Sequence, residues 1–312
     1  MENKQTHFVA DPSEVEFVEV DAVRVNDRPT NLWLDAWRDA RRRPIFYIAG
    51  AMILLVTLVA LFPGWFTSIA PDRCDLKYSL MGPTGNHILG FTRQGCDIYS
   101  RIIFGTSTSL SVGIIVTVLT TLVGIFVGAI AGFYGKWLDA VLSRAGDIFF
   151  SIPYILAAVV IMSVFSKYRN VWVISMAIGV FAWPSTARVL RAEVLRVKNS
   201  DFVMAATAVG LSRFRILMRH VMPNSIAPVI AVTTISLAAA IVAEATLSFL
   251  GVGLPSSTMS WGNDISQAQA NLRTDPQVLL WPSLALSLTV LAFILMGEVL
   301  RDALDPKARA LR

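Results

Sequence analysis

The chain has 312 residues, of which 54% are hydrophobic and only 16% are charged. Ordinary soluble domains carry about 25% charged residues, so these few charges would not cover the apolar surface of a soluble protein of this size. The composition excludes soluble, disordered and collagenous classes, and two cysteines are too few for a disulfide scaffold or a cysteine-rich metal cluster. We therefore expect an all-α integral membrane protein.

The first 43 residues divide into two parts. Residues 1–31 are polar and partly acidic, and they lack the early apolar run of a secretory signal peptide. The alternation at residues 15–21 is compatible with a short strand, but we expect a solvated cytoplasmic tail that is partly disordered. Residues 32–43 predict an amphipathic helix at the membrane interface. Its apolar face carries Leu32, Trp33, Ala36, Trp37 and Ala40, and its basic face carries Arg38, Arg41, Arg42 and Arg43.

Six stretches are long and apolar enough to cross the roughly 30 Å of hydrocarbon in a bilayer. They lie at residues 45–67, 110–133, 148–165, 171–190, 226–250 and 281–300. With these spans, 20 of the 27 basic residues fall on the side of both termini and 7 fall on the other side. Basic residues concentrate on the cytoplasmic side, so both termini are expected in the cytoplasm. The net charge of +5 thus reflects topology, and nucleic-acid binding is not needed to explain it.

The long cytoplasmic connection between the fourth and fifth spans has the features of a docking element. Residues 199–201 offer N-caps for a helix, Gly210 suits its C-terminus, and Ser212 can cap a second helix that ends near Pro223. Apolar knobs inside a basic rim suit insertion into a groove on a soluble partner. From the pattern alone, however, we favour an amphipathic connector that lies on the lipid surface. The apolar knobs are Phe202, Met204 and Phe214.

The same loop carries a recognisable motif. Residues 205–206 are Ala-Ala, Gly210 follows after three residues, and residues 220–223 follow after nine more as His-Val-Met-Pro. This spacing resembles the coupling loop of ABC importer permeases, whose signature is Glu-Ala-Ala, three residues, Gly, nine residues, Ile-x-Leu-Pro. Met204 stands at the Glu position and His220 at the Ile position. In that family the loop sits in a cleft of the cytoplasmic ATPase.

Other segments extend the resemblance over nearly the whole chain, from about residue 33 to residue 309. Residues 219–224, Arg-His-x-x-Pro-Asn, are similar to the peptide/nickel subfamily. Residues 87–101 are similar to its His-x-Leu-Gly-Thr-Asp-x-x-Gly-Arg-Asp-x-x-Ser-Arg stretch. The stretch 243–263 and the ending at 300–307 also match. The chain thus resembles the second permease type of dipeptide/oligopeptide importers.

This resemblance implies a type I, MetI-like permease with six transmembrane helices. Residues 32–105 would hold the amphipathic helix, the first span and an outer loop, and residues 301–312 a cytoplasmic tail. Residues 106–300 would form the five-helix core, with the coupling loop at 199–223. The residues that it places at the ATPase are Asp201, Met204, Ala205, Ala206, Gly210, Arg219, His220 and Pro223.

The resemblance also implies the partners and the task. The permease would pair with a second homologous permease, with two ABC ATPase domains that bind ATP and Mg, and with an extracytoplasmic substrate-binding protein. It would import peptides by alternating access across a bacterial cytoplasmic membrane. It would be surrounded by membrane lipid and would have no cofactor or catalytic residue of its own. Import of a nickel chelate, glutathione or haem by the same architecture is the alternative.

Two features on the outer side need separate interpretation. Glu244 lies about two turns from the outer end of the fifth span, where a carboxylate needs a cavity or a partner. It either lines the translocation path or gate, or makes structural hydrogen bonds, and we favour the second. Cys74 and Cys96 share an outer segment where disulfides are permitted, and we expect a bridge that staples the loop beside the binding-protein surface. Two unpaired thiols are the alternative.

No motif for catalysis, metal binding or ATP binding is present. The three histidines are scattered, and we expect His220 to be a helix-end residue and not a ligand. The chain has no phosphate-binding loop and no set of catalytic side chains on one membrane face. Two other classes therefore compete weakly with the permease. An ion-coupled secondary transporter should show internal repeats and several buried charges, and an intramembrane enzyme needs a catalytic constellation.

Overall fold

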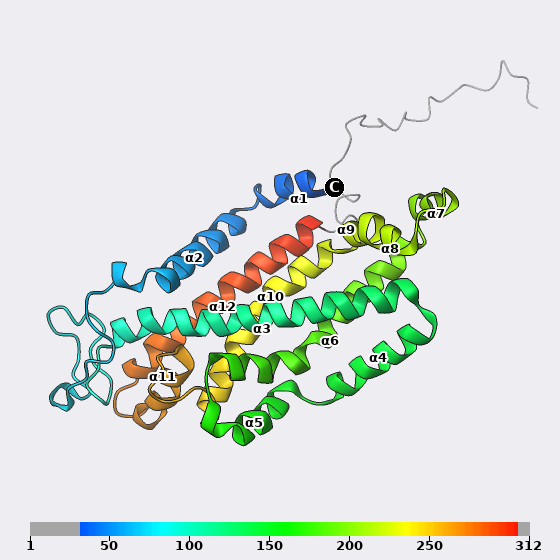
Figure 1. Cartoon of the computed structure of the whole chain (residues 1–312). Helices are drawn as coiled ribbons and strands as arrows, with labels where there is room; N and C mark the ends of the chain where they lie inside the picture. Colours follow the sequence, from blue (N-terminus) through cyan, green and yellow to red (C-terminus); the bar gives the residue numbers. More distant parts are fainter. Residues whose placement is uncertain (1–31, 305–312) are drawn as a thin grey trace, which may run out of the picture.

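The structure of the protein is a computed structural model, of which residues 32–304 are described. The described chain is helical, and its long helices lie side by side along one direction (Figure 1). The longest, α3 (Ile98–Tyr134), has 37 residues and packs against α6 (Val171–Lys198). Glycines make this contact close: a Cβ added at Gly124 or Gly128 would come within 2.6 Å of α6. Small residues at helix contacts are typical of membrane bundles.

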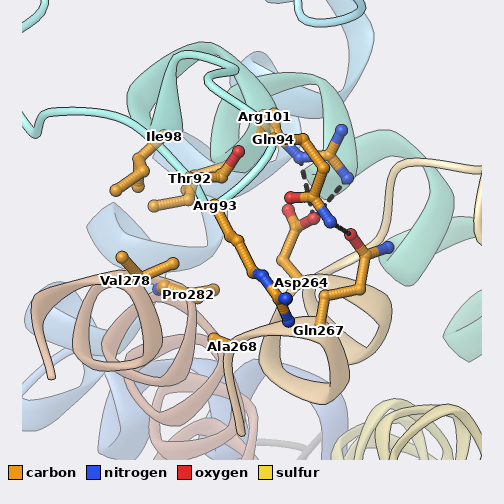
Figure 2. Close-up of a pocket in the computed structure, with 11 residues that line it drawn as sticks. Thr92, Arg93, Gln94, Ile98, Arg101, Asp264, Gln267, Ala268, Val278 and Pro282 are labelled. Carbon is orange, nitrogen blue, oxygen red and sulfur yellow. Dashed lines mark hydrogen bonds and ion pairs between the residues drawn. The ribbon is translucent and has the colours of Figure 1, made fainter. Parts of the chain in front are cut away.

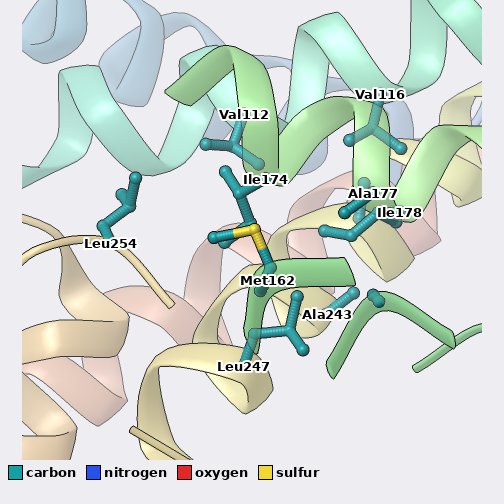
Figure 3. Packing of buried hydrophobic residues seen from close by; sticks show 11 residues of the cluster. Val112, Val116, Met162, Ile174, Ala177, Ile178, Ala243, Leu247 and Leu254 are labelled. Atoms are coloured by element: carbon teal, nitrogen blue, oxygen red, sulfur yellow. The ribbon is translucent and has the colours of Figure 1, made fainter. Parts of the chain in front are cut away.

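Two further long helices, α10 (Ala227–Phe249) and α12 (Gln277–Leu304), complete the bundle. An apolar core joins α3, α6 and α10 to α5 (Tyr154–Val164), as Figure 3 shows. The side chain of Met162 on α5 is completely buried at its centre, beside Ile174 and Leu247. This core fixes α5 although α5 has only 11 residues.

On the side of the bundle opposite α5, α1 (Leu32–Ala40) and α2 (Pro44–Leu61) lie along α12 (Figure 1). The predicted amphipathic segment is thus a helix, with Ala36 and Ala40 buried against the C-terminal part of α12. Arg43, between the two helices, pairs with Asp302 of α12 at 2.6 Å and with Asp39 at 3.0 Å. These contacts attach α1 and the start of α2 to the last turns of α12.

The third expected span differs from the prediction. A continuous helix over residues 148–165 is wrong, because α4 (Lys136–Ser151) and α5 meet at a bend of 76°. Pro153 has no N–H for a helical hydrogen bond and disfavours the helical conformation of Ile152, which is extended with φ −89° and ψ 120°. Within the described residues, five helices are long and apolar enough to cross a membrane, or six if this bent pair is one span. The all-α, membrane-spanning fold class is confirmed.

The connections gather at the two ends of the bundle (Figure 1). At one end, the chain between α6 and α10 forms α7 (Asp201–Ala208), α8 (Arg213–Ile216), the π-helical turn η4 (Leu217–Val221) and α9 (Met222–Ser225). At the other end lie the segment 62–97 and α11 (Trp261–Ala268). Short 3₁₀ turns complete the order, at η1 (Pro63–Trp65), η2 (Leu76–Tyr78), η3 (Ser166–Tyr168) and η5 (Gln269–Asn271). The predicted tail at residues 1–31, including the alternation at 15–21, lies outside the described residues. Of the predicted tail at 301–312, residues 301–304 continue α12, and the rest lie outside the described residues.

Candidate functional site

The loop between α6 and α10 is an ordered helical hairpin. Gly210 adopts φ +85° after α7, a conformation that glycine reaches without strain. Its N–H donates to the carbonyl of Thr207 at 3.0 Å, and that of Leu211 donates to the carbonyl of Ala206 at 3.2 Å. This pair of bonds is the Schellman arrangement, which ends a helix and turns the chain. The expected helix, glycine turn and second helix are present, although the second helix continues past Pro223 to Ser225.

Five apolar side chains of this hairpin are exposed, and we name them together the coupling surface. It consists of Phe202, Met204, Val209, Phe214 and Met218, which are 47%, 56%, 81%, 66% and 53% exposed. Exposed arginines at 213, 215 and 219 flank these apolar side chains. An exposed apolar patch with a charged rim marks an interaction site. The sequence analysis had not singled out Val209 and Met218, whose side chains flank the turn and the second helix.

The inner side of the hairpin is fixed to the bundle. Val203 and Ala206 of α7 are buried, and they join a core that includes Val194 of α6 and Val229 of α10. Just before α7, the Lys198 ammonium donates to two carbonyls, Gly132 and Phe133, at 3.1 Å each. These carbonyls belong to the last turn of α3, where a cation also stabilises the helix dipole. The coupling surface is therefore attached to α3, α6 and α10 together.

The eight residues that the coupling motif predicts separate into two groups. Ala206 is buried in the core that holds the hairpin against the bundle, and His220 is half-buried. The other six are exposed, and their contact with an ATPase stays a prediction; they are Asp201, Met204, Ala205, Gly210, Arg219 and Pro223.

At the opposite end, Glu244 of α10 is completely buried in a network of hydroxyl groups. Its carboxylate accepts hydrogen bonds from Ser248 and Ser260 at 3.0 Å each and from Ser109 of α3 at 3.3 Å. The Ser109 oxygen also accepts the N–H of Trp261 at 3.2 Å. The network thus joins α3, α10 and α11. Its residues do not line the cavity beside Arg101, the cavity at the bend between α4 and α5, or the cavity between α4 and α6. A role for Glu244 in the translocation path stays a prediction.

A buried ion pair lies beside this network (Figure 2). Asp264 of α11 accepts hydrogen bonds from the Nε and a terminal nitrogen of Arg101 in α3, at 2.9 and 2.5 Å. Burial raises the pKa of the Asp264 carboxyl, while the charge and hydrogen bonds of Arg101 act in the opposite direction. The pair fixes α11 to the start of α3. This helix begins at Ile98, twelve residues before the start of the predicted span at residue 110. The early start follows from α11 covering the polar first turns of α3.

Cys74 and Cys96 form a disulfide within the outer segment. Their backbones also pair as an isolated antiparallel bridge, and the N–H of Asp75 donates to the carbonyl of Gly95 at 3.2 Å. The bridge leads directly to Asp97, which accepts hydrogen bonds from the N–H of Ser100 and from the ring of His87. The disulfide therefore lies at the base of α3, and its role toward a binding protein stays a prediction. In residues 32–304, no group of three or more His, Cys, Asp or Glu side chains is placed to hold a metal ion.

Comparison with known families agrees with this geometry. Residues 124–310 match the family described as "Binding-protein-dependent transport system inner membrane component". Residues 31–83 match the "N-terminal TM domain of oligopeptide transport permease C". The first family covers more than half of the chain, and the second covers α1, α2 and the start of the outer segment.

Individual relatives are similar to the chain over a length that includes both of these family segments. The chain is 33% identical to the dipeptide transport system permease protein DppC of Alkalihalophilus pseudofirmus, over 89% of this chain and 91% of the relative. It is 34% identical to the glutathione transport system permease protein GsiD of Pectobacterium atrosepticum, over 89% and 92%. Among solved structures, an inward-facing MetNI methionine ABC transporter is similar with a TM-score of 0.55 and 19% identity, over 66% of this chain and 96% of that one. The chain therefore belongs to the multi-pass, non-catalytic permease subunits of ABC importers, in the oligopeptide and dipeptide permease branch.

Proposed function

We propose that this chain is the second permease subunit of an ATP-driven importer of short peptides. It pairs with a homologous permease, stands on two ABC ATPase domains that bind ATP and Mg, and receives its solute from an extracytoplasmic binding protein. The observation that carries the proposal is the coupling surface, an exposed apolar patch on a hairpin that is rigidly fixed to three long helices. An unfixed lipid-surface connector would not need such attachment.

The attachment explains how force would pass through the subunit. An ATPase domain that moves on binding ATP would displace Phe202 and Phe214, whose side chains are exposed on the hairpin. Val203 and Ala206 then transmit the displacement to α6 and α10, and Lys198 transmits it to α3. The bundle would move as one body because packed interiors deform little. ATP can shift the transporter only through contacts that differ between its two states, and the coupling surface supplies such contacts.

Two relatives indicate the class of solute. One is a dipeptide permease subunit and the other a glutathione permease subunit, each 33% or 34% identical over 89% of the chain. Glutathione is itself a tripeptide, so the shared chemistry is a short peptide of two or three residues. Glutathione is the second candidate because of the GsiD relative, whereas no observation on this chain favours a nickel chelate or haem.

Reconstitution into proteoliposomes tests the proposal. The chain is purified with its partner permease, ATPases and binding protein, and uptake of a labelled dipeptide and of labelled glutathione is measured. We expect uptake to need ATP on the side of the membrane that carries the ATPase domains. Uptake should persist when ionophores remove all ion gradients. Uptake that is driven by an ion gradient without ATP would contradict the proposal. Competition between the two labelled solutes then ranks dipeptide against glutathione.

A further inference from the structure

The bend between α4 and α5 borders an open pocket of about 380 Å³ on the membrane-spanning bundle. Its walls come from α3, the bend itself, α6 and α10. This volume lies within the range of pockets that bind small molecules, about 300 to 1,000 Å³. We name it the bend chamber and ask what fills it.

The helices place the bend chamber near the middle of the membrane. α5 has 11 residues after the bend, so the bend lies about 16 Å from the outer end of that helix. Ala239, in the opposite wall, lies ten residues before the end of α10 at Phe249, which is about 15 Å. The hydrocarbon of a bilayer is roughly 30 Å thick, so both walls reach half depth.

The backbone at the bend argues against lipid as the occupant. Ile152 and Pro153 are not helical, and both are exposed in the isolated subunit. Backbone that is not in a regular helix occurs at membrane depth only where it is buried in protein or lines a water-filled cavity, because hydrocarbon offers no hydrogen bonds. The bend chamber must therefore face water or a second protein.

The side chains favour a wet chamber over a dry protein contact. Four residues with hydroxyl groups line separate wall positions, Thr120, Tyr154, Ser185 and Ser236. The Thr120 and Ser185 hydroxyls donate to carbonyls of their own helices, so toward the chamber they serve as acceptors. Between them lie the aromatic rings of Phe149, Phe150 and Phe181, and none of the 15 lining residues is charged. A few polar groups among aromatic side chains are the usual composition of a small-molecule site. One charged pair borders this lining: the Arg188 guanidinium lies 3.9 Å from the Phe150 ring and pairs with Asp147 at 2.9 Å.

We propose that the bend chamber is the half-site through which this subunit contacts the transported solute at mid-membrane. The inference rests on the proposed function and names how the solute is held. A short peptide carries charged ends, and no wall residue can neutralise them, so water must remain in the chamber around them. The rings and hydroxyls then contact the body of the peptide weakly. The chamber selects by size and not by charge, and it releases the solute readily.

Cysteine labelling tests this proposal directly. Both native cysteines are joined in the disulfide, so Ala239→Cys adds the single free thiol of the chain. The matched control is Leu288→Cys, on the exposed side of α12 and about 16 Å from its outer end. In the reconstituted complex, we expect a water-soluble maleimide to label Ala239→Cys and not Leu288→Cys, since Leu288 faces lipid or dry protein. Cycling with ATP, binding protein and saturating dipeptide should slow the labelling of Ala239→Cys.

A second pair of variants tests the proposal by dipeptide uptake. Ala239→Trp should abolish dipeptide uptake while the complex still assembles, and Leu288→Trp should transport normally. An unlabelled Ala239→Cys, labelling that dipeptide does not slow, or normal uptake by Ala239→Trp would each overturn the proposal. If the wild-type complex imports neither dipeptide nor glutathione, the proposed function fails. In that case, maleimide labelling of Ala239→Cys without solute still reports whether water reaches the bend chamber. Absence of labelling overturns this inference independently of the proposed function.

Discussion

Arg101 and Asp264 form a buried ion pair that joins the first turn of α3 to α11, across 163 residues of sequence. Their side chains are only 10% and 8% exposed. One carboxylate oxygen accepts both hydrogen bonds, and the other, Oδ2, is buried without a partner among the described atoms. α11 therefore depends on Arg101 for its charge balance.

Removing one partner of this pair should destabilise the subunit strongly. A buried charge left alone costs about 3 to 5 kcal/mol, whereas replacing both charges by apolar groups is often close to neutral. We expect Arg101→Met and Asp264→Leu each to lower the melting temperature of the purified complex, and the double variant to recover much of the loss. The exposed pair Arg196–Glu193 supplies the control, because Arg196→Met should change stability by less than about 1 kcal/mol. Equal losses in the single and double variants would contradict a mutual dependence.

The Cys74–Cys96 disulfide should support the outer surface without being needed for ATP hydrolysis. It closes a segment with a sequence separation of 22, for which cross-linking stabilises the fold by about 3 kcal/mol. In the Cys74→Ser/Cys96→Ser variant, we expect basal ATPase activity to persist and its stimulation by the binding protein to fall. Mass spectrometry of non-reduced peptides should find the two cysteines linked. Free thiols in the native protein, or full stimulation in the double variant, would remove this role.

The sequence predicted the architecture because its signals are local. Apolar length sets the spans, the asymmetry of basic residues sets the orientation, and Gly210 marks the turn of the coupling hairpin. Each of these signals depends on a few neighbouring residues. The helix at α1 and the turn at Gly210 accordingly lie where they were expected.

The differences arise where distant segments meet. The bend before Tyr154 had a local signal, Pro153 within an apolar stretch, but only the packing of α5 on α6 and α10 makes the bend stable. The early start of α3 depends on α11, which covers Arg101 from the other end of the chain. A hydropathy pattern does not contain such pairings. The hydroxyl partners of Glu244 are likewise spread over more than 150 residues.

The turn at Gly210 should control the coupling of ATP hydrolysis to transport. A Cβ at this position would meet no atom within 4 Å, so Gly210→Ala suffers only from φ +85°, at a cost of about 1 to 2 kcal/mol. Gly210→Pro also loses the hydrogen bond to the Thr207 carbonyl and requires φ near −65°. We expect Gly210→Pro to hydrolyse ATP without importing dipeptide and Gly210→Ala to be mildly impaired. Gly210→Asn should behave like wild type, since asparagine tolerates this conformation. Normal coupling in Gly210→Pro would show that the turn transmits nothing.

Substitutions of Glu244 should separate a structural role from a role in the translocation path. Glu244→Gln keeps an acceptor and adds a donor, and the serine hydroxyls can rotate to satisfy both, so we expect nearly unchanged melting temperature and uptake. Glu244→Leu leaves the hydroxyls of Ser248, Ser260 and Ser109 without their common partner, at about 1 to 3 kcal/mol for each group left unsatisfied. That variant should lose stability and loosen α11, which faster proteolysis near Trp261 would report.

The opposite pattern identifies a lining role for Glu244. A carboxylate that meets the solute would make Glu244→Gln lower peptide uptake at unchanged melting temperature, and the effect would depend on the charge of the peptide. The network geometry argues against this result, because Gly262 of α11 is packed so closely that a Cβ there would lie 3.1 Å from the Glu244 carboxylate. Gly262→Ala therefore serves as an independent probe. It should reproduce the stability loss of Glu244→Leu while leaving the carboxylate in place, since it displaces α11 from the same hydroxyl groups.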